Sequence, residues 1–332
     1  MQNRRSFIQS SVAASLIAGL TLPALGQTQS GKTVFPQKTV TFIVPLAPGG
    51  GTDILARKLA FSLQALWGQP VVVENVGGAS SIIGTQRVAR AAPDGYTLLV
   101  TTNGAIVSNR FLFKNLPYDP DKDFIPVAQL ANIDMVLLAH KSLAANNLKE
   151  LVALAKKEPG KITYASYGNG SQPHLLMELF NKREGIQLTH VPYKGLGPAL
   201  TSVMAGETMM TLTGRGSGTA AIESGNTKVL NYNSDKRDPE HPEVPTSAES
   251  GYPYFRVNTW HGVFAPRGTP KEIVDKIYSD VRQVLNQPEF RKDMLERGYG
   301  IPTFTPEQFA AAIQEEVQAT GEMVKAAGLK PE

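Results

Sequence analysis

The sequence predicts an α/β protein of two domains. Its 332 residues are about twice the length of a typical domain of roughly 150 residues. Hydrophobic residues make up 42% of the chain and charged residues 19%, a composition typical of folded proteins rather than disordered ones. Strand-like and helix-like patterns alternate along the chain. Parallel strands joined by crossover helices are an economical fold for such an alternation.

In the first part of the chain, short apolar runs are separated by segments with apolar residues at helical spacing. The predicted order is a strand at 39–44, a helix at 53–66, a strand at 71–73, a helix at 82–91 and a strand at 96–100. A loop is predicted at 115–126, and a second series of elements begins after it.

The second series repeats the alternation. The predicted order is a strand at 135–139, a helix at 148–156, a strand at 162–166, a helix at 175–183, an extended segment at 188–192, a helix at 198–205 and a strand at 229–232. Residues 235–258 contain four prolines and are predicted to be irregular, because proline lacks the backbone donor that helices and sheets need. Two helices, at 271–285 and 306–327, complete the pattern.

Charge and cysteine content exclude several classes of function. The 33 basic and 29 acidic residues give a net charge of +4, and the two signs are interspersed without long runs. We therefore expect no nucleic-acid partner. The chain has no cysteine, which excludes disulfides, thiolate metal sites and a catalytic thiol.

The N-terminus is typical of an export signal. Arg4 and Arg5 precede a mildly apolar stretch at 11–22, and residues 24–26 (Ala-Leu-Gly) fit a small-x-small cleavage site. The apolar stretch is shorter than the roughly 20 residues that span a bilayer. We expect residues 1–26 to be removed on export. The signal is either of the twin-arginine type or an ordinary Sec signal with two adjacent arginines.

A unit of strand, glycine-rich turn and helix start occurs three times, at 44–53, 75–81 and 167–174. Glycine lets the backbone turn sharply and approach a ligand. The helix that follows presents free N–H groups and a partial positive charge. Any one of these segments could be a simple tight turn. Three of them together predict a cleft for a small anion.

Known catalytic motifs do not fit the sequence. It contains no Walker-type phosphate loop, no dinucleotide fingerprint after the first strand, no G-x-S-x-G and no H-E-x-x-H. The five histidines lack the spacing of metal ligands. Ser171 and His174 could serve a hydrolase, but a serine at a helix N-cap is the simpler interpretation. We predict no enzyme, metal or cofactor, with a hydrolase using these two residues as the alternative.

Two further side chains each allow two interpretations. Arg215 lies among small residues and either clamps a carboxylate through both of its terminal nitrogens or is a solvated loop residue. Trp260 either stacks on a ligand or fills a hinge between domains.

Several segments together resemble the periplasmic solute receptors of tripartite tricarboxylate transporters, the TctC or Bug family. The similar stretches are 44–53, 68–75, 92–99, 170–175, 190–195, 244–251 and 260–270. They extend over essentially the whole mature chain in the order expected for the family.

The resemblance implies a two-lobed periplasmic binding protein of the Venus flytrap kind (type II-like), in which each lobe is a mixed sheet flanked by helices. Lobe one would comprise 33–132 and 259–332, and lobe two 133–258. The implied function is a periplasmic receptor that delivers a small carboxylate to the membrane components of a tripartite tricarboxylate transporter. A ligand-sensing module without a transporter is an alternative. We also expect a monomer.

The resemblance also implies the residues that bind the carboxylate. In lobe one they are Pro48, Gly49, Gly50, Gly51, Thr52, Asp53, Ser80, Ser81, Thr102 and Asn103. In lobe two they are Gly168, Asn169, Gly170, Ser171 and His174. With Arg215 as a second positive group, a dicarboxylate, aliphatic or aromatic, is the first expectation. Leu46, His261 and the segment 209–221 depart from the pattern of the family, so the ligand cannot be copied from a relative.

Overall fold

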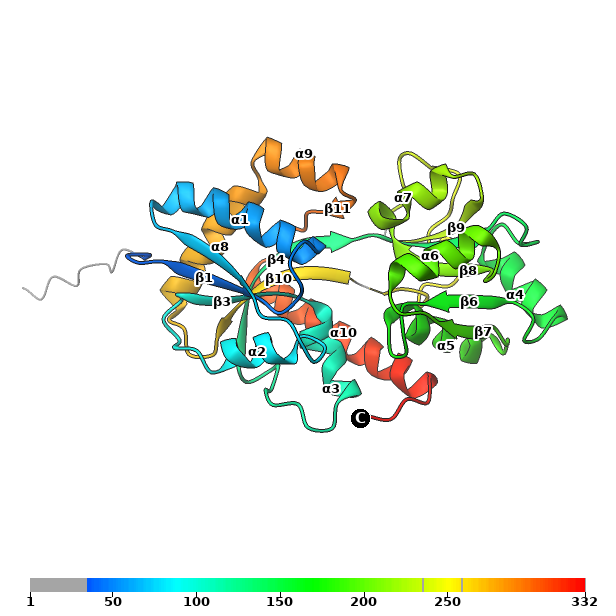
Figure 1. The fold of residues 1–332 in the computed structure, drawn as a ribbon, viewed down its shortest axis with the longest axis horizontal. Coiled ribbons are helices and arrows are strands. Elements are labelled where there is room, and N and C mark those ends of the chain that lie inside the picture. Colours follow the sequence, from blue (N-terminus) through cyan, green and yellow to red (C-terminus); the bar gives the residue numbers. More distant parts are fainter. Residues whose placement is uncertain (1–34, 235, 258, 332) are drawn as a thin grey trace, which may run out of the picture. The chain divides into compact units, whose positions relative to one another are not determined.

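The computed structural model describes residues 35–234, 236–257 and 259–331, and the predicted export signal lies outside these residues. The described chain forms two mixed β-sheets flanked by helices (Figure 1). This confirms the predicted fold class.

The first sheet has six strands in the order β11-β4-β10-β3-β1-β2. They are β1 (Val40–Val44), β2 (Val71–Asn75), β3 (Thr97–Thr102), β4 (Phe124–Ile133), β10 (Thr259–Pro266) and β11 (Tyr299–Gly300). Strand β1 runs parallel to β2 and β3, whereas β10 is antiparallel to β3 and β4. The strands from the two ends of the chain therefore join in one sheet.

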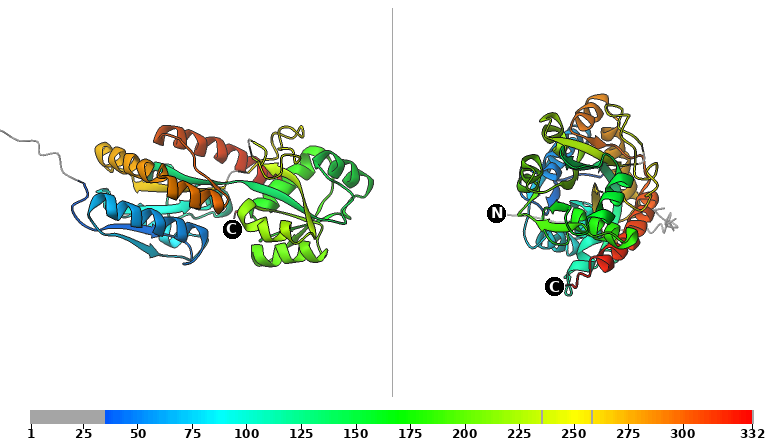
Figure 2. Two further views of the ribbon diagram at one scale, coloured as in Figure 1. Left: turned by 90° about the horizontal axis from the view of Figure 1, so that it is seen from above. Right: turned by 90° about the vertical axis from the view of Figure 1, so that its right-hand side faces the viewer.

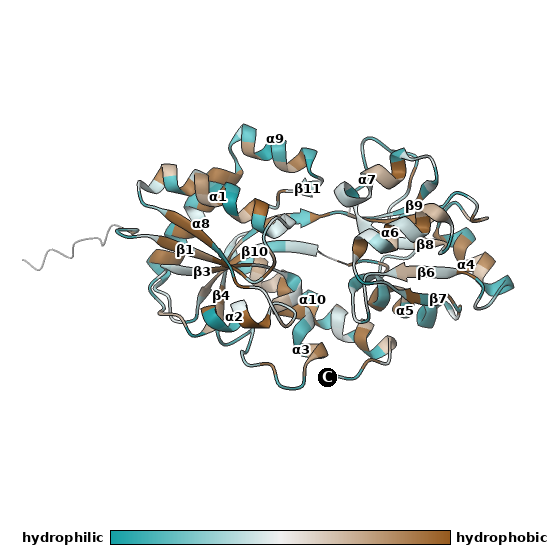
Figure 3. Cartoon of the chain, viewed as in Figure 1, coloured by the Kyte–Doolittle hydropathy of each residue, from teal (hydrophilic) through white to brown (hydrophobic). Residues whose placement is uncertain are grey.

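Helices cover both faces of the first sheet. They are α1 (Gly51–Trp67), α2 (Ile82–Ala89), α3 (Asn109–Leu112), α8 (Lys271–Leu285), α9 (Pro288–Glu296) and α10 (Pro306–Ala326), with a π-helical turn at Gly104–Ser108. Helices α1 and α8 pack on one face, while α2 and the first half of α10 pack on the other. Figure 3 shows hydrophobic residues along β1 and mostly hydrophilic ones on α9.

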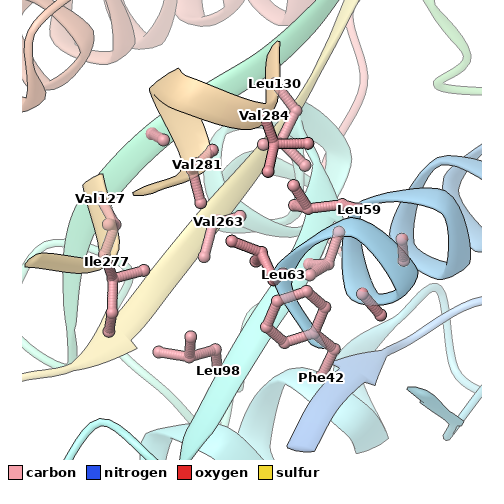
Figure 4. Packing of buried hydrophobic residues seen from close by; sticks show 14 of the residues in the cluster. Phe42, Leu59, Leu63, Leu98, Val127, Leu130, Val263, Ile277, Val281 and Val284 are labelled. Carbon is pink, nitrogen blue, oxygen red and sulfur yellow. The ribbon is translucent and has the colours of Figure 1, made fainter. Parts of the chain in front are cut away.

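The core between α1, α8 and the sheet explains why these segments fold as they do. Leu55, Leu59 and Leu63 recur at helical spacing on α1 and are fully buried. Figure 4 shows Leu59 and Leu63 packed with Phe42 of β1 and with valines of α8 and the sheet. Each such side chain contributes about 1.5–3 kcal/mol when it leaves water.

The second sheet has five strands in the order β7-β6-β8-β5-β9. They are β5 (Met135–His140), β6 (Thr163–Ser166), β7 (Thr189–Pro192), β8 (Met210–Gly214) and β9 (Thr227–Asn233). Its helices are α4 (Leu148–Lys157), α5 (Gln172–Glu184), α6 (Leu196–Ala205) and α7 (Arg215–Glu223). Helices α4 and α5 pack on one face, and α6 and α7 on the other.

Helix α10, the red helix of Figures 1 and 2, belongs to both halves of the molecule. Phe309 and Ile313 pack in a core of the first sheet, whereas Met323 and Val324 pack in the core of the second.

The structure corrects several sequence expectations. The loop expected at 115–126 is shorter, because β4 begins at Phe124. The sequence did not predict strands β4, β8, β10 and β11 or helices α3, α7 and α9. Three helices, rather than two, follow β10 in the described chain.

Candidate functional site

The loop between β1 and α1, together with the first turn of α1, holds six of the predicted binding residues, Pro48 to Asp53. Gly49 has a φ of 82°, a left-handed conformation that glycine adopts without strain. Helix α1 begins at Gly51, and no side chain caps its start. Its first N–H groups are therefore not satisfied by a capping side chain, and the acidic residue Asp53 lies in its first turn.

The Asp53 carboxylate fixes this loop. It accepts hydrogen bonds from the Gly49 N–H at 2.8 Å, from Arg57 Nε at 3.1 Å and from Asn75 Nδ2 at 2.9 Å. Burial alone would raise the pKa of Asp53, but these hydrogen bonds outweigh it and lower the pKa. Asp53 therefore shapes the site with its side chain, and only its backbone is left for a ligand.

Thr52 is linked to His261, one of the residues that depart from the pattern of the family. Its Oγ1 lies 3.1 Å from Nδ1 of His261 on β10. His261 is only 3% exposed, and burial lowers its pKa to about 4, so the imidazole is neutral at neutral pH. Its Nε2 has no hydrogen-bond partner among the described residues.

The second predicted loop, which contains Ser80 and Ser81, is strained. Ala79, Ser80 and Ser81 have φ values of 44°, 53° and 73°, and a non-glycine residue in this region costs on the order of 1–3 kcal/mol. Asn109 Nδ2 donates to the Ser80 carbonyl at 2.9 Å, and Thr85 Oγ1 donates to that of Ser81 at 2.7 Å. Such strain is characteristic of functional loops.

Thr102 and Asn103 lie at the end of β3, two strands from β2 in the same sheet. Thr102 is opposite His261 in the strand register. Asn103 is buried, and its Nδ2 donates to Glu316 of α10 at 2.6 Å. This amide contact anchors α10 to the end of β3.

The loop from Gly168 to Ser171 follows β6 in the second sheet. His174 Nδ1 accepts the Gly170 N–H at 3.0 Å, and Ser171 Oγ donates to the Gly168 carbonyl at 2.6 Å. Ser171 occupies the N-cap of α5 without capping it. Serine and histidine thus each hold the backbone of the loop. The His174 ring also stacks on His190, with centroids 4.0 Å apart.

A cavity of about 350 Å³ opens beside this loop. It is lined by Ile133, Met135, Tyr167, Gln172, Gly195, Leu196, Thr213, Gly214, Ser217 and Thr259. These residues include the first turns or N-caps of α5, α6 and α7, none of which is capped by a side chain. No charged side chain lines the cavity. Three helix starts therefore give it a positive potential from backbone groups alone.

Arg215 is engaged elsewhere. Its guanidinium group pairs with Asp238 and Glu240. Burial would lower the Arg215 pKa, but the two carboxylates raise it. Arg215 does not line the cavity, although it begins α7.

The predicted residues thus lie in loops and first helical turns at the carboxyl ends of β1, β3, β6 and β8 and after β2, where open α/β sheets bind ligands. The described residues contain no cluster of three or more histidines or carboxylates that could hold a metal ion. Among them, no helix is long and apolar enough to cross a membrane.

The chain has two mixed sheets flanked by helices, and uncapped helix starts lie beside the loops of both sheets. This fold and this kind of site are those of the two-lobed solute-binding proteins. Residues 55–329 match the family described as tripartite tricarboxylate transporter family receptor, TctC. The chain belongs to this family.

Individual relatives agree with this assignment. Protein BugT of Bordetella pertussis is 35% identical over 94% of both chains. Rpa4515 of R. palustris, solved with adipate, is 33% identical with a TM-score of 0.75, over 90% of this chain and 100% of that one. MatC of Rhodopseudomonas palustris, solved with bound malate, is 36% identical with a TM-score of 0.71, over 87% and 100% of the two chains.

Proposed function

We propose that the protein is a periplasmic receptor that binds a small dicarboxylate between two lobes. In this proposal it presents the ligand to the membrane components of a tripartite tricarboxylate transporter. The observation that carries the proposal is the pair of uncapped helix-start sites, one at α1 and one at the cavity beside α5, α6 and α7. The cavity suits a carboxylate without a charged side chain. At α1 the ionised Asp53 is paired with Arg57, so the first backbone N–H groups remain to bind the ligand.

The two sheets with their helices would form the two lobes, with residues 33–132 and 259–332 in one and 133–258 in the other. Residues 1–26 would direct export by the twin-arginine or Sec route. The mature protein would act as a monomer and without catalysis, since a receptor needs only to bind, close and release its ligand.

One carboxylate would lie at the start of α1, near the loop of Ser80 and Ser81. The other would lie in the cavity, against the first turns of α5, α6 and α7. Adipate and malate, the acids found with Rpa4515 and MatC, are both dicarboxylates. In this assignment Arg215 orients α7 through its two carboxylate partners instead of touching the ligand.

The first test is a calorimetric and thermal-shift screen of residues 27–332 with adipate, malate and the corresponding monocarboxylates. We expect saturable binding of at least one diacid and a rise in Tm that follows RT ln(1 + [L]/Kd). NMR of the acid after incubation should show it unchanged. Binding of none of these acids, or their turnover, would contradict the proposal.

Ser217→Asp tests the position of the second carboxylate. Ser217 is the third residue of α7 and lines the cavity, so an aspartate there suits the helix dipole but repels a ligand carboxylate. We expect diacid affinity to fall at least tenfold while Tm holds. The isosteric Ser217→Asn should bind nearly as wild type. If the two variants bound the diacid with equal affinity, the second carboxylate would not lie in this cavity.

A further inference from the structure

The turn Arg297–Tyr299, between α9 and β11, contacts both proposed carboxylate sites. Tyr299 extends toward the start of α1, where a Cβ added to Gly51 would overlap its hydroxyl group. Its ring meets that of His261 edge to face, with centroids 5.6 Å apart. The hydroxyl group therefore lies at the helix start that faces the first carboxylate.

The Tyr299 hydroxyl is suited to donate to an anion. Burial raises its pKa, so the phenol keeps its proton at neutral pH. Among the described residues, its ring contacts that of His261, and Arg297 acts on the hydroxyl group through its charge. Thr52 Oγ1 and His261 Nδ1 beside it are already linked to each other, and His261 Nε2 is fully buried, which leaves the phenol as a donor for the ligand.

The residue before Tyr299 contacts the other half of the molecule. A Cβ on Gly216, the second residue of α7, would overlap the Arg297 carbonyl oxygen, and a Cβ on Gly298 would lie 2.8 Å from the Gly216 nitrogen. Gly298 has a φ of 76°, which by itself favours glycine. Gly216 is not among the residues with positive φ. Only the close approach to Arg297 requires a glycine there.

We propose that Tyr299 is a ligand-contacting residue, and that the contact between Gly298 and Gly216 closes the second lobe onto the ligand that Tyr299 holds. The inference rests on the proposed function. Because Gly298 and Tyr299 share a peptide bond, a ligand that fixes the phenol also fixes the surface on which α7 docks. Occupancy at α1 is thereby coupled to the position of the helix start that binds the second carboxylate.

Tyr299→Phe tests the hydroxyl group. We expect affinity for adipate or malate, whichever binds wild type, to fall about tenfold, as for a lost hydrogen bond to a charged group. Tm without ligand should stay the same. Tyr278→Phe, which removes a phenol bonded to the Phe304 carbonyl, is the matched control and should bind as wild type. An unchanged affinity in Tyr299→Phe would overturn the ligand role of Tyr299.

Gly216→Ala tests the closing contact. Alanine is the better helix former, so α7 should be as stable as before, while the added methyl group keeps Arg297 and α7 apart. We expect affinity to fall at least fivefold and small-angle scattering to show a larger radius of gyration for the liganded variant than for liganded wild type. Thr219→Ala, on the exposed side of α7, is the control. An unchanged affinity and radius would overturn the closing role.

The double variant Tyr299→Phe/Gly216→Ala tests the coupling. We expect its loss of affinity to differ at least twofold from the product of the single losses. Simple additivity would overturn the coupling. If wild type bound neither acid, the proposed function would fail first and the ligand role of Tyr299 with it. If wild type bound and the variants matched it, this inference alone would fail.

Discussion

At the scale of single residues, an uncharged imidazole holds the loop that follows β6. His174 accepts the Gly170 N–H through Nδ1, which is possible only while that nitrogen carries no proton. Burial lowers the pKa of His174, partly opposed by Glu178, and the stacked His190 has a pKa lowered to about 4 by burial and by His174. Protonation of one of these two rings would disfavour protonation of the other.

This arrangement predicts that ligand affinity falls in acid. A His174 pKa below its ordinary 6.5 means that the loop stays intact above pH 6.5 and loses the Gly170 contact as the pH falls through the lowered value. Calorimetric titrations with adipate or malate between pH 4.5 and 8 should show constant affinity at the upper end and progressive loss below 6.5.

His174→Asn offers the control, because its Oδ1 accepts the same N–H but does not titrate. The variant should bind with less pH dependence than wild type. His140→Asn, at a half-exposed histidine bonded to Ser142, should keep the full dependence. If the pH profile of His174→Asn matched that of wild type, the loop would not be the titrating element.

At the scale of secondary structure, α10 is anchored through a buried carboxylate. Glu316 accepts hydrogen bonds from Asn103 Nδ2 and from Trp260 Nε1, each at 2.6 Å. Burial raises its pKa to about 7, although these two donors act in the opposite direction. Trp260, for which the sequence left ligand stacking open, is thus buried against α10.

Glu316 predicts a loss of stability as the pH rises. Its folded pKa of about 7 lies above the ordinary 4.5, so the contribution of the protonated group is complete below pH 4.5 and is lost as the pH rises through 7. The difference in unfolding free energy between Glu316→Gln and wild type should grow by about 3 kcal/mol between pH 4.5 and 8. Urea denaturation across this range measures it. Glu315→Gln, at an exposed neighbouring position of α10, is the control for the loss of a carboxylate. A flat difference in Glu316→Gln would contradict the prediction.

Elements with strong local patterns could be predicted, and those held by distant contacts could not. Helix α1 and strands β1 to β3 follow apolar spacing directly. Helix α7 begins with Arg-Gly-Ser-Gly, a poor helix sequence, and is held where Gly218 packs against Thr213 and Leu138.

The same division applies to the site. The glycine-rich turns are local features, so the sequence could identify them. The Thr52–His261 contact joins residues 209 positions apart, and the place of Tyr299 beside Gly51 likewise depends on the assembled sheet. The ion pairs of Arg215 come from an irregular proline-containing segment that carries no periodic pattern.

At the scale of the whole molecule, α10 holds the two sheets together, because its two ends are buried in different cores. We therefore expect one cooperative unfolding transition, with equal calorimetric and van't Hoff enthalpies.

The double variant Met323→Ala/Val324→Ala removes the anchor in the second core, at a cost of several kcal/mol. Scanning calorimetry should then resolve two transitions, the earlier one belonging to the second sheet. Val317→Ala, a half-buried position between the two anchors, should keep a single transition.

A saturating diacid should merge the two transitions of the double variant, because a ligand that contacts both lobes is released when either lobe unfolds. If the double variant unfolded in one transition, α10 would not be the element that couples the sheets. If the diacid raised only one of two transitions, it would be bound by one lobe alone.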